Sequence, residues 1–278
     1  MRFCSVQCGL RVAVLTCATL CTCLALTACV SPDTSRLDAL TTPETHPQRE
    51  RALRRLTLAT AYFEQGQNTP ALQEVRAALQ IDPGFADAYN LLGLIHQREG
   101  APQLAEPSFQ QAVQLASSDA ALSATLASAQ HNLGWFLCEQ NRFSEAHTQL
   151  NRALTHVAYR HPGKTWMALG VCQYKAGQTA DARLSFEQAL KLDNRNPTAR
   201  FVWASLEQST DPVRAQDILT PLNRSSDANA ASLSLGIELA QASSQATEAQ
   251  ALMAQLTRQF PNSIQAQAWI QKKTIQAQ

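Results

Sequence analysis

The sequence predicts an all-α protein, a solenoid of about six helical hairpins followed by one capping helix. Three recurring features predict it. An apolar pair opens each of four segments, an alanine follows its leucine by thirteen residues, and a second alanine comes seven residues later. The pairs are Leu58-Ala59, Leu92-Gly93, Leu133-Gly134 and Leu169-Gly170, and the alanines are Ala71, Ala78, Ala105, Ala112, Ala146, Ala153, Ala182 and Ala189. A larger apolar residue lies between the two alanines of each segment, so every second helix carries a small-large-small stripe at helical spacing.

The first two copies are 34 residues apart, which is the period of the tetratricopeptide repeat. Small residues at fixed positions allow two helices to approach closely, and the large residue fills the space between them. Because the same offsets recur four times, the sequence predicts tetratricopeptide repeats stacked into a right-handed superhelical solenoid.

The predicted elements follow in order along a repeat domain over residues 49–278. We expect repeats over 52–85, 86–119, 127–162, 163–196, 197–230 and 231–262, and a capping helix over 263–276. Proline stops such as Asp82-Pro83 and His161-Pro162 separate some of them. Residues 120–126 exceed the period, and we expect them to lengthen the next helix by about two turns. In the capping helix we expect Ala266, Trp269 and Ile270 to face inward.

Residues 1–28 have the pattern of a secretory signal peptide. Arg2 and Arg11 precede an apolar run that ends in small residues. The last four letters, Leu26-Thr27-Ala28-Cys29, resemble a bacterial lipobox, which implies cleavage before Cys29 and attachment of lipid to its sulfur. An uncleaved membrane anchor is the alternative, but the apolar stretch is short and is interrupted by Thr and Cys.

Residues 29–48 are predicted to be a flexible tether. Pro32, Pro43 and Pro47 lie among Ser, Thr and Asp, with too little apolar content to pack, and the expected mean span is about 25 Å. Val30 follows the lipid-bearing cysteine where an Asp would favour retention in the inner membrane. We therefore expect the chain at the periplasmic face of the outer membrane, anchored by its acyl chains.

Removal of the signal peptide takes away two arginines, so the formal net charge changes from +1 to −1. This balance, with no basic stripe among aromatics, argues against nucleic-acid binding. The six histidines show no paired ligand spacing, and the chain has no Cys-x-x-Cys, phosphate-binding glycine loop or nucleophile elbow. We therefore expect no catalytic residue, no metal, no cofactor beyond the lipid on Cys29, and no small-molecule substrate.

Two cysteines of the repeats form a candidate disulfide. Cys138 and Cys172 lie near the ends of neighbouring first helices, and they differ by two positions relative to their Leu-Gly pairs. That offset could turn them toward each other. In an oxidising compartment we expect a disulfide, worth about 4 kcal/mol in the chain-entropy model. The alternative is two small buried residues that stay reduced.

The segment from His131 to Cys138 (His-Asn-Leu-Gly-Trp-Phe-Leu-Cys), with the later Ala168-Leu169-Gly170-Val171-Cys172, resembles the type IV pilus biogenesis lipoproteins called PilF or PilW. The resemblance extends over nearly the whole chain after the signal peptide, although the family more often has Asn at position 131 and the fifth repeat is degenerate. It implies a pilotin. Such a lipoprotein binds subunits of the outer-membrane secretin and promotes their localisation and multimerisation, and hence pilus biogenesis and twitching motility.

The repeat register also predicts a partner-binding groove. First-helix residues at consensus positions 2, 5, 9, 12 and 13 face the concave side in this repeat class, and they mix apolar anchors with separated charges. These candidates are Leu53, Leu56, Thr60, Phe63, Asn90, Leu94, Gln97, His131, Trp135, Lys164, Met167 and Tyr174. Alternatively, Leu53, Leu56 and Phe63 pack an N-terminal cap.

Capture of a chain terminus is excluded. Asn132 and Lys164 occupy two of the five positions of a tetratricopeptide carboxylate clamp, but Asn90, Leu94 and Ala168 replace the expected Lys, Asn and Arg. Two other roles stay open on the sequence alone. One is an adaptor of another envelope machine, such as a tight-adherence pilus, outer-membrane protein insertion or peptidoglycan-enzyme regulation, and the other is a passive scaffold.

Overall fold

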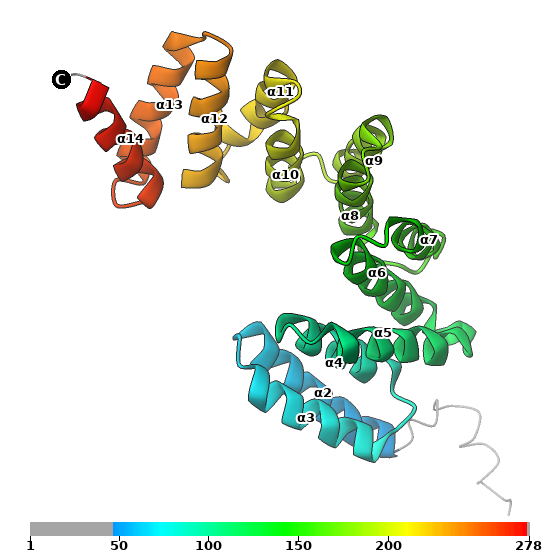
Figure 1. The fold of residues 1–278 in the computed structure, drawn as a ribbon. Helices are drawn as coiled ribbons and strands as arrows, with labels where there is room; N and C mark the ends of the chain where they lie inside the picture. Colours follow the sequence, from blue (N-terminus) through cyan, green and yellow to red (C-terminus); the bar gives the residue numbers. More distant parts are fainter. Residues whose placement is uncertain (1–46, 277–278) are drawn as a thin grey trace, which may run out of the picture. The chain divides into compact units, whose positions relative to one another are not determined.

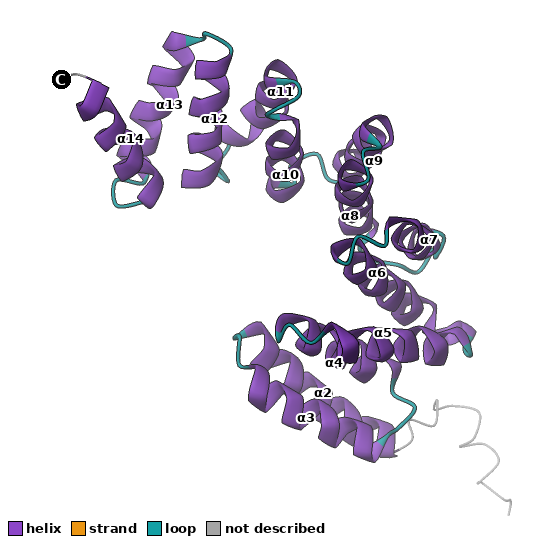
Figure 2. Ribbon diagram, viewed as in Figure 1, coloured by secondary structure: helices purple, strands orange, loops and turns teal. Residues whose placement is uncertain are grey.

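The computed structural model describes residues 47–276, in which all regular structure is helical (Figures 1 and 2). The predicted signal peptide, Cys29 and most of the predicted tether lie outside the described residues. The helices are α2 (Pro47–Glu64), α3 (Asn68–Ile81), α4 (Ala86–Arg98), α5 (Pro102–Ser117), α6 (Ser123–Glu139), α7 (Phe143–Leu154), α8 (Pro162–Lys175), α9 (Thr179–Leu192), α10 (Pro197–Glu207), α11 (Pro212–Asn223), α12 (Ala230–Ala242), α13 (Ala246–Gln259) and α14 (Ile264–Gln276), with a 3₁₀ turn η1 (Ala120–Leu122). The all-α repeat fold is confirmed.

The helices pack as six hairpins, α2–α3 through α12–α13, followed by α14. The second helix of each hairpin packs against the first helix of the next, except that α9 and α10 make a lighter contact. Neighbouring first helices also contact one another from α2 to α10. They therefore form a continuous layer of their own, which we call the first-helix layer.

The small-large-small stripe forms the interior of each hairpin. In the second hairpin Ala105, Phe109 and Ala112 are fully buried, and Val75 or Leu150 takes the place of the phenylalanine in its neighbours. The Phe109 ring lies directly against the backbone of Gly93, where an added Cβ would be 2.5 Å from the ring. The Leu-Gly landmark thus marks the point where two helices approach most closely.

The buried side chains form four separate clusters along the stack. One spans α2–α4, the next α5–α8, the third α9–α12 and the last α12–α14. Each cluster joins neighbouring elements, as expected for a repeat protein whose units contact their immediate neighbours.

The degenerate fifth repeat is joined to the fourth by a buried ion pair. Arg183 of α9 donates two hydrogen bonds of 2.7 Å to the carboxylate of Glu207 in α10, which is 1% exposed. The indole Nε1 of Trp203 donates to the same carboxylate at 3.3 Å, and the Trp203 ring stacks on Phe186. Arg183 therefore lowers the pKa of Glu207 against the effect of burial, and the carboxylate stays charged. These contacts link the two repeats although α10 and α11 are short.

Three details differ from the sequence-based expectation. Residues 120–122 form η1, capped by Asp119, so α6 gains about one turn instead of two. Helix α2 begins at Pro47, within the predicted tether, because proline is well suited to the first position of a helix. Ile270 is not buried: it is 50% exposed, and it lines an open hollow between α14 and α13.

The rest of the α14 prediction agrees with the structure. Ala266 and Trp269 are buried, and the Trp269 indole donates a hydrogen bond of 3.0 Å to Ser234 of α12. In the described part of the chain, no helix combines the length and apolar character needed to span a bilayer.

Candidate functional site

The first-helix layer is held together by polar contacts between successive repeats. Asn132 of α6 donates a hydrogen bond of 2.9 Å to the Asn90 side chain of α4. On either side of this pair, Thr125 donates to Asp87 and Gln97 donates to Glu139. These three hydrogen bonds hold α4 against α6. The side chains of the candidate residues Asn90 and Gln97 take part in them, so each already has a partner within the protein.

The contact between α6 and α8 includes His131. Its Nδ1 is hydrogen-bonded to the Thr165 hydroxyl at 2.8 Å, and this hydroxyl is in turn bonded to the phenol of Tyr159, also at 2.8 Å. Burial, together with the nearby Lys164 and His161 side chains, lowers the pKa of His131 to about 4. The imidazole is therefore neutral at pH 7. Thr165 and Tyr159 were not foreseen, because neither has a consensus position in the repeat.

The structure places the twelve groove candidates in different environments. Leu53 and Lys164 are exposed, and Leu56 is buried. The other nine are partly exposed: Thr60, Phe63, Asn90, Leu94, Gln97, His131, Trp135, Met167 and Tyr174. The assignment of Leu56 to the groove is wrong, because its side chain belongs to the α2–α4 core together with Ala52 and Ala59.

The three residues predicted to pack an N-terminal cap have different roles in the structure. Leu53 is 51% exposed, so it packs no cap, whereas Leu56 is a core residue. Phe63 is intermediate between these two. Part of its ring packs on the α2–α4 core, and the guanidinium of Arg98 lies over the ring, 3.4 Å from its centroid. Leu53 is therefore the N-terminal apolar candidate that is most accessible to a partner.

Cys138 and Cys172 are fully buried and lie side by side, between α6 and α8. The neighbouring Cys172 side chain lowers the pKa of Cys138, while Cys138 and burial raise the pKa of Cys172 well above its ordinary value. Both are thiols in the structure. The two residues belong to one core cluster between α6 and α8, and the disulfide itself stays a prediction.

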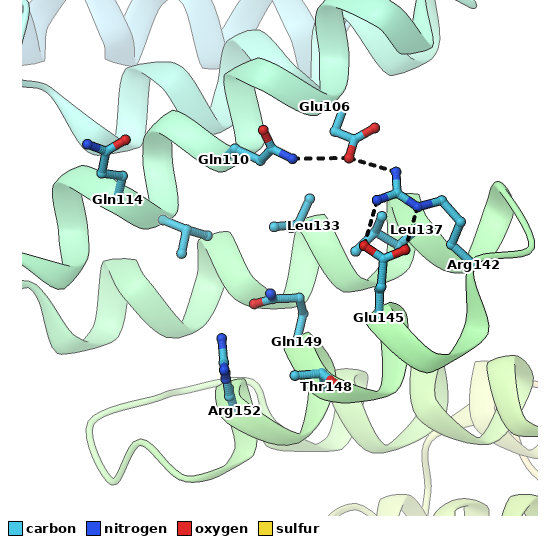
Figure 3. A pocket seen from close by; sticks show the side chains of 11 residues that line it. Glu106, Gln110, Gln114, Leu133, Leu137, Arg142, Glu145, Thr148, Gln149 and Arg152 are labelled. Atoms are coloured by element: carbon cyan, nitrogen blue, oxygen red, sulfur yellow. Dashed lines mark hydrogen bonds and ion pairs between the residues drawn. The ribbon is translucent and has the colours of Figure 1, made fainter.

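A hollow that the sequence did not indicate lies between the second helices α5 and α7, with α6 as its floor (Figure 3). It has a volume of about 430 Å³. We call it the α5–α7 cleft. Its lining residues are Glu106, Gln110, Val113, Gln114, Leu133, Leu137, Arg142, Glu145, Thr148, Gln149 and Arg152. The rim positions carry no repeat consensus, so nothing in the sequence pattern could point to the cleft. Among the described residues no three His, Cys, Asp or Glu side chains gather as a metal site.

Comparison with protein families identifies the same repeat fold as the structure. Tetratricopeptide-repeat family profiles match residues 59–100, 84–157 and 163–196. The type IV pilus assembly protein PilF of Pseudomonas aeruginosa is 30% identical over 219 residues, which cover 78% of this chain and 84% of that protein. The chain belongs to the PilF family.

Solved structures support this assignment. A structure of Pseudomonas aeruginosa PilF is 28% identical and covers 81% of this chain and 99% of the other, with a TM-score of 0.64. A crystal structure of PilW, described as a widely conserved type IV pilus biogenesis factor, is 26% identical and covers 79% and 98%, with a TM-score of 0.68. The protein is thus a tetratricopeptide-repeat protein similar to these factors of type IV pilus biogenesis.

Proposed function

We propose that this PilF-family chain is a lipoprotein of the outer membrane that binds subunits of the type IV pilus secretin and promotes their localisation and multimerisation. Pilus biogenesis and twitching motility would depend on that step. Membership of the PilF family, over most of the repeat domain, is the observation that carries the proposal. The lipobox ending at Cys29 supports the anchor, and the exposed residues of the first-helix layer support the binding surface.

The proposed mechanism needs no bond to be made or broken. The lipid on Cys29 gives the chain a membrane address, and the tether gives the repeats reach. The first-helix layer offers exposed Leu53 and Lys164 beside partly exposed aromatic side chains such as Trp135. Apolar anchors with a separated charge suit a peptide segment of a protein partner. In this proposal the protein is an adaptor without catalytic residues.

The test is an immunoblot of the secretin, from heated and unheated membrane fractions of the wild type, a deletion strain and a Cys29→Ala strain. We expect secretin multimers and twitching to be lost on deletion, and multimers to be mislocalised with Cys29→Ala. Normal multimers in the outer membrane of all three strains would overturn the proposal.

A matched pair of variants tests the surface. Leu53→Asp places a charge on the first-helix layer at a residue that is 51% exposed, and Leu184→Asp does the same on α9, a second helix, at a residue that is 59% exposed. Both should fold, because neither side chain is in the core. We expect fewer secretin multimers with Leu53→Asp than with Leu184→Asp. Equal amounts of multimers in the two variants would count against the first-helix layer as the binding surface.

A further inference from the structure

We propose that the hollow between α13 and α14 is a binding site for an amphipathic α-helix of a partner protein. This α13–α14 hollow has a volume of about 1090 Å³, compared with about 430 Å³ for the α5–α7 cleft. Its walls are α13 and α14, which lie side by side at the C-terminal end of the described chain (Figure 1). The first-helix layer, which supports the proposed function, extends from α2 to α10 and is a separate surface. The two proposals can therefore fail independently.

The repeat register places this hollow where a second helix would lie. In α5 and α11, the residues one, five and eight places after the first repeat alanine, Ala105 or Ala215, line the space toward the next second helix. That space is the α5–α7 cleft in one case, and a hollow of about 200 Å³ between α11 and α13 in the other. In α13 the same three positions line the α13–α14 hollow, and they hold Gln250, Ala254 and Thr257. This face of α13 is not covered by any second helix of the described chain.

The two covered spaces show what kind of segment fits such a face. The side chains that the next second helix presents across them share one spacing. They are Glu145, Thr148, Gln149 and Arg152 from α7, and Glu248, Ala251, Leu252 and Gln255 from α13. Both sets follow the pattern i, i+3, i+4 and i+7, which is one face of an α-helix. We therefore expect the partner to dock a helix with this spacing.

Apolar side chains line both walls of the α13–α14 hollow. Trp269 and Ile270 project from α14, and Met253 and Ala254 from α13. Ile270 is 50% exposed, and Ala254 is exposed as well. Covering apolar surface is favourable by about 25 cal/mol per Å². A helix with apolar residues at the four facing positions therefore suits the hollow.

The position of Ile270 also selects the size of one partner residue. Ile270 lies 34 residues after the landmark Gly236. In the hairpins such a glycine receives a large side chain from the second helix, as Gly93 receives Phe109. At α14 the large side chain belongs to the first helix of the pair instead. We therefore expect the partner helix to place a small residue, such as alanine, against Ile270.

Charge complementarity favours a partner helix with an acidic residue over a second copy of this chain. Of the residues that line the hollow, Lys272 alone is charged, and its ammonium lies 4.6 Å from the centroid of the Trp269 ring. An aspartate or glutamate of the partner helix would complement Lys272. Two copies joined through this hollow about a two-fold axis would instead bring like charges together.

The test is a phage-display selection against the immobilised full chain. The library consists of peptides of about 18 residues, five helical turns, on an alanine-rich scaffold that is randomised at the four facing positions and at their flanks. Selected peptides are then synthesised, their affinities measured by fluorescence anisotropy and their helicity by circular dichroism. We expect apolar residues at the four positions, one of them small, an acid at one flank, and increased helicity on binding.

Ala254→Glu and Ala251→Glu are a matched pair, because both alanines are exposed on α13 and Ala251 faces the hollow between α11 and α13 instead. Ala254→Glu should weaken the peptides by about tenfold or more, and Ala251→Glu should leave them unchanged. Lys272→Glu should weaken the acidic peptides and restore those in which the acid is changed to lysine. Arg258→Glu is its control, since Arg258 lies in the last turn of α13, outside the lining.

Three outcomes would overturn the proposal. The first is that no selected peptide becomes helical on binding. The second is that Ala254→Glu and Ala251→Glu behave alike, or that Leu53→Asp abolishes peptide binding, which would place the peptides on the first-helix layer. The third is a dimer of the free chain, seen by sedimentation, that Ala254→Glu dissociates, because a second copy would then be the occupant.

Discussion

At the scale of single residues, His131 shows how one polar group adapts to the contact between two repeats. Its ring joins α6 to Thr165 of α8, and through that hydroxyl to Tyr159 in the preceding loop. Because the imidazole is largely buried beside Lys164 and His161, it is held in the neutral form. An asparagine at this position would make hydrogen bonds without titrating.

The neutral imidazole predicts a pH-dependent stability. The pKa of His131 is about 4 in the folded chain and 6.5 when unfolded, so the unfolded state binds the extra proton between these values. The free energy of unfolding should therefore fall as pH drops from about 6.5 to 4, by about 2 kcal/mol from this residue. Urea unfolding at pH 7 and pH 4.5 should show a smaller loss for His131→Asn than for the wild type. An equal loss in both proteins would contradict this account.

The Cys138–Cys172 pair gives a second prediction at this scale. In protein produced with its predicted signal peptide and isolated without reductant, we expect neither cysteine to react with N-ethylmaleimide in denaturant until a reductant is added, after which mass spectrometry should show two additions. Reduction should also lower the urea midpoint, because the cross-link of about 4 kcal/mol is lost. Two additions without reductant would show that the thiols stay free.

At the scale of the helical hairpin, close approach at a glycine sets the spacing between two helices. Gly93→Ala would place a Cβ 2.5 Å from the buried Phe109 ring, which has no free space into which to move. We expect a loss of about 2 kcal/mol from overpacking, measured by urea unfolding. Gly163→Ala is the control, since an added Cβ there would meet its nearest neighbours at 3.9 Å. It should raise stability by up to about 1 kcal/mol, because alanine is a better helix former than glycine, and equal losses in the two variants would contradict the steric explanation.

The hairpins could be predicted because their interior repeats. Alanines 71 and 78, with Val75 between them, occupy the positions that the stripe assigns to them. The structure differs from the prediction in two places, at Ile270 of α14 and in the segment before α6. Ile270 stays half exposed because the hollow between α13 and α14 is open, and residues 120–126 are divided between η1 and α6 by the cap at Asp119.

Of the candidate sites, the sequence located the first-helix layer but not the α5–α7 cleft. The layer follows from consensus positions, with Leu56 as the exception, because an apolar residue at such a position can turn either to the core or to the partner. The cleft depends on polar side chains such as Gln149 and Arg152, at positions the repeat leaves free to vary. These side chains line one cleft because the fold places α5 next to α7.

At the scale of the whole described chain, the four separate core clusters predict local unfolding. Leu256→Ala empties a fully buried site in the α12–α14 cluster, at a cost of about 2–5 kcal/mol. Hydrogen exchange should accelerate over residues 230–276 and stay unchanged over 47–81. Leu91→Ala, in the α2–α4 cluster, should produce the opposite pattern. Uniform acceleration in either variant would show that the stack unfolds as one unit.

The same division into clusters determines how the protein would respond to mechanical load. A chain pulled between its two ends would open one cluster before the next. Each 34-residue repeat that opens would add about 100 Å of extended chain. The remaining clusters would stay folded, so the chain would lengthen in steps instead of unfolding all at once.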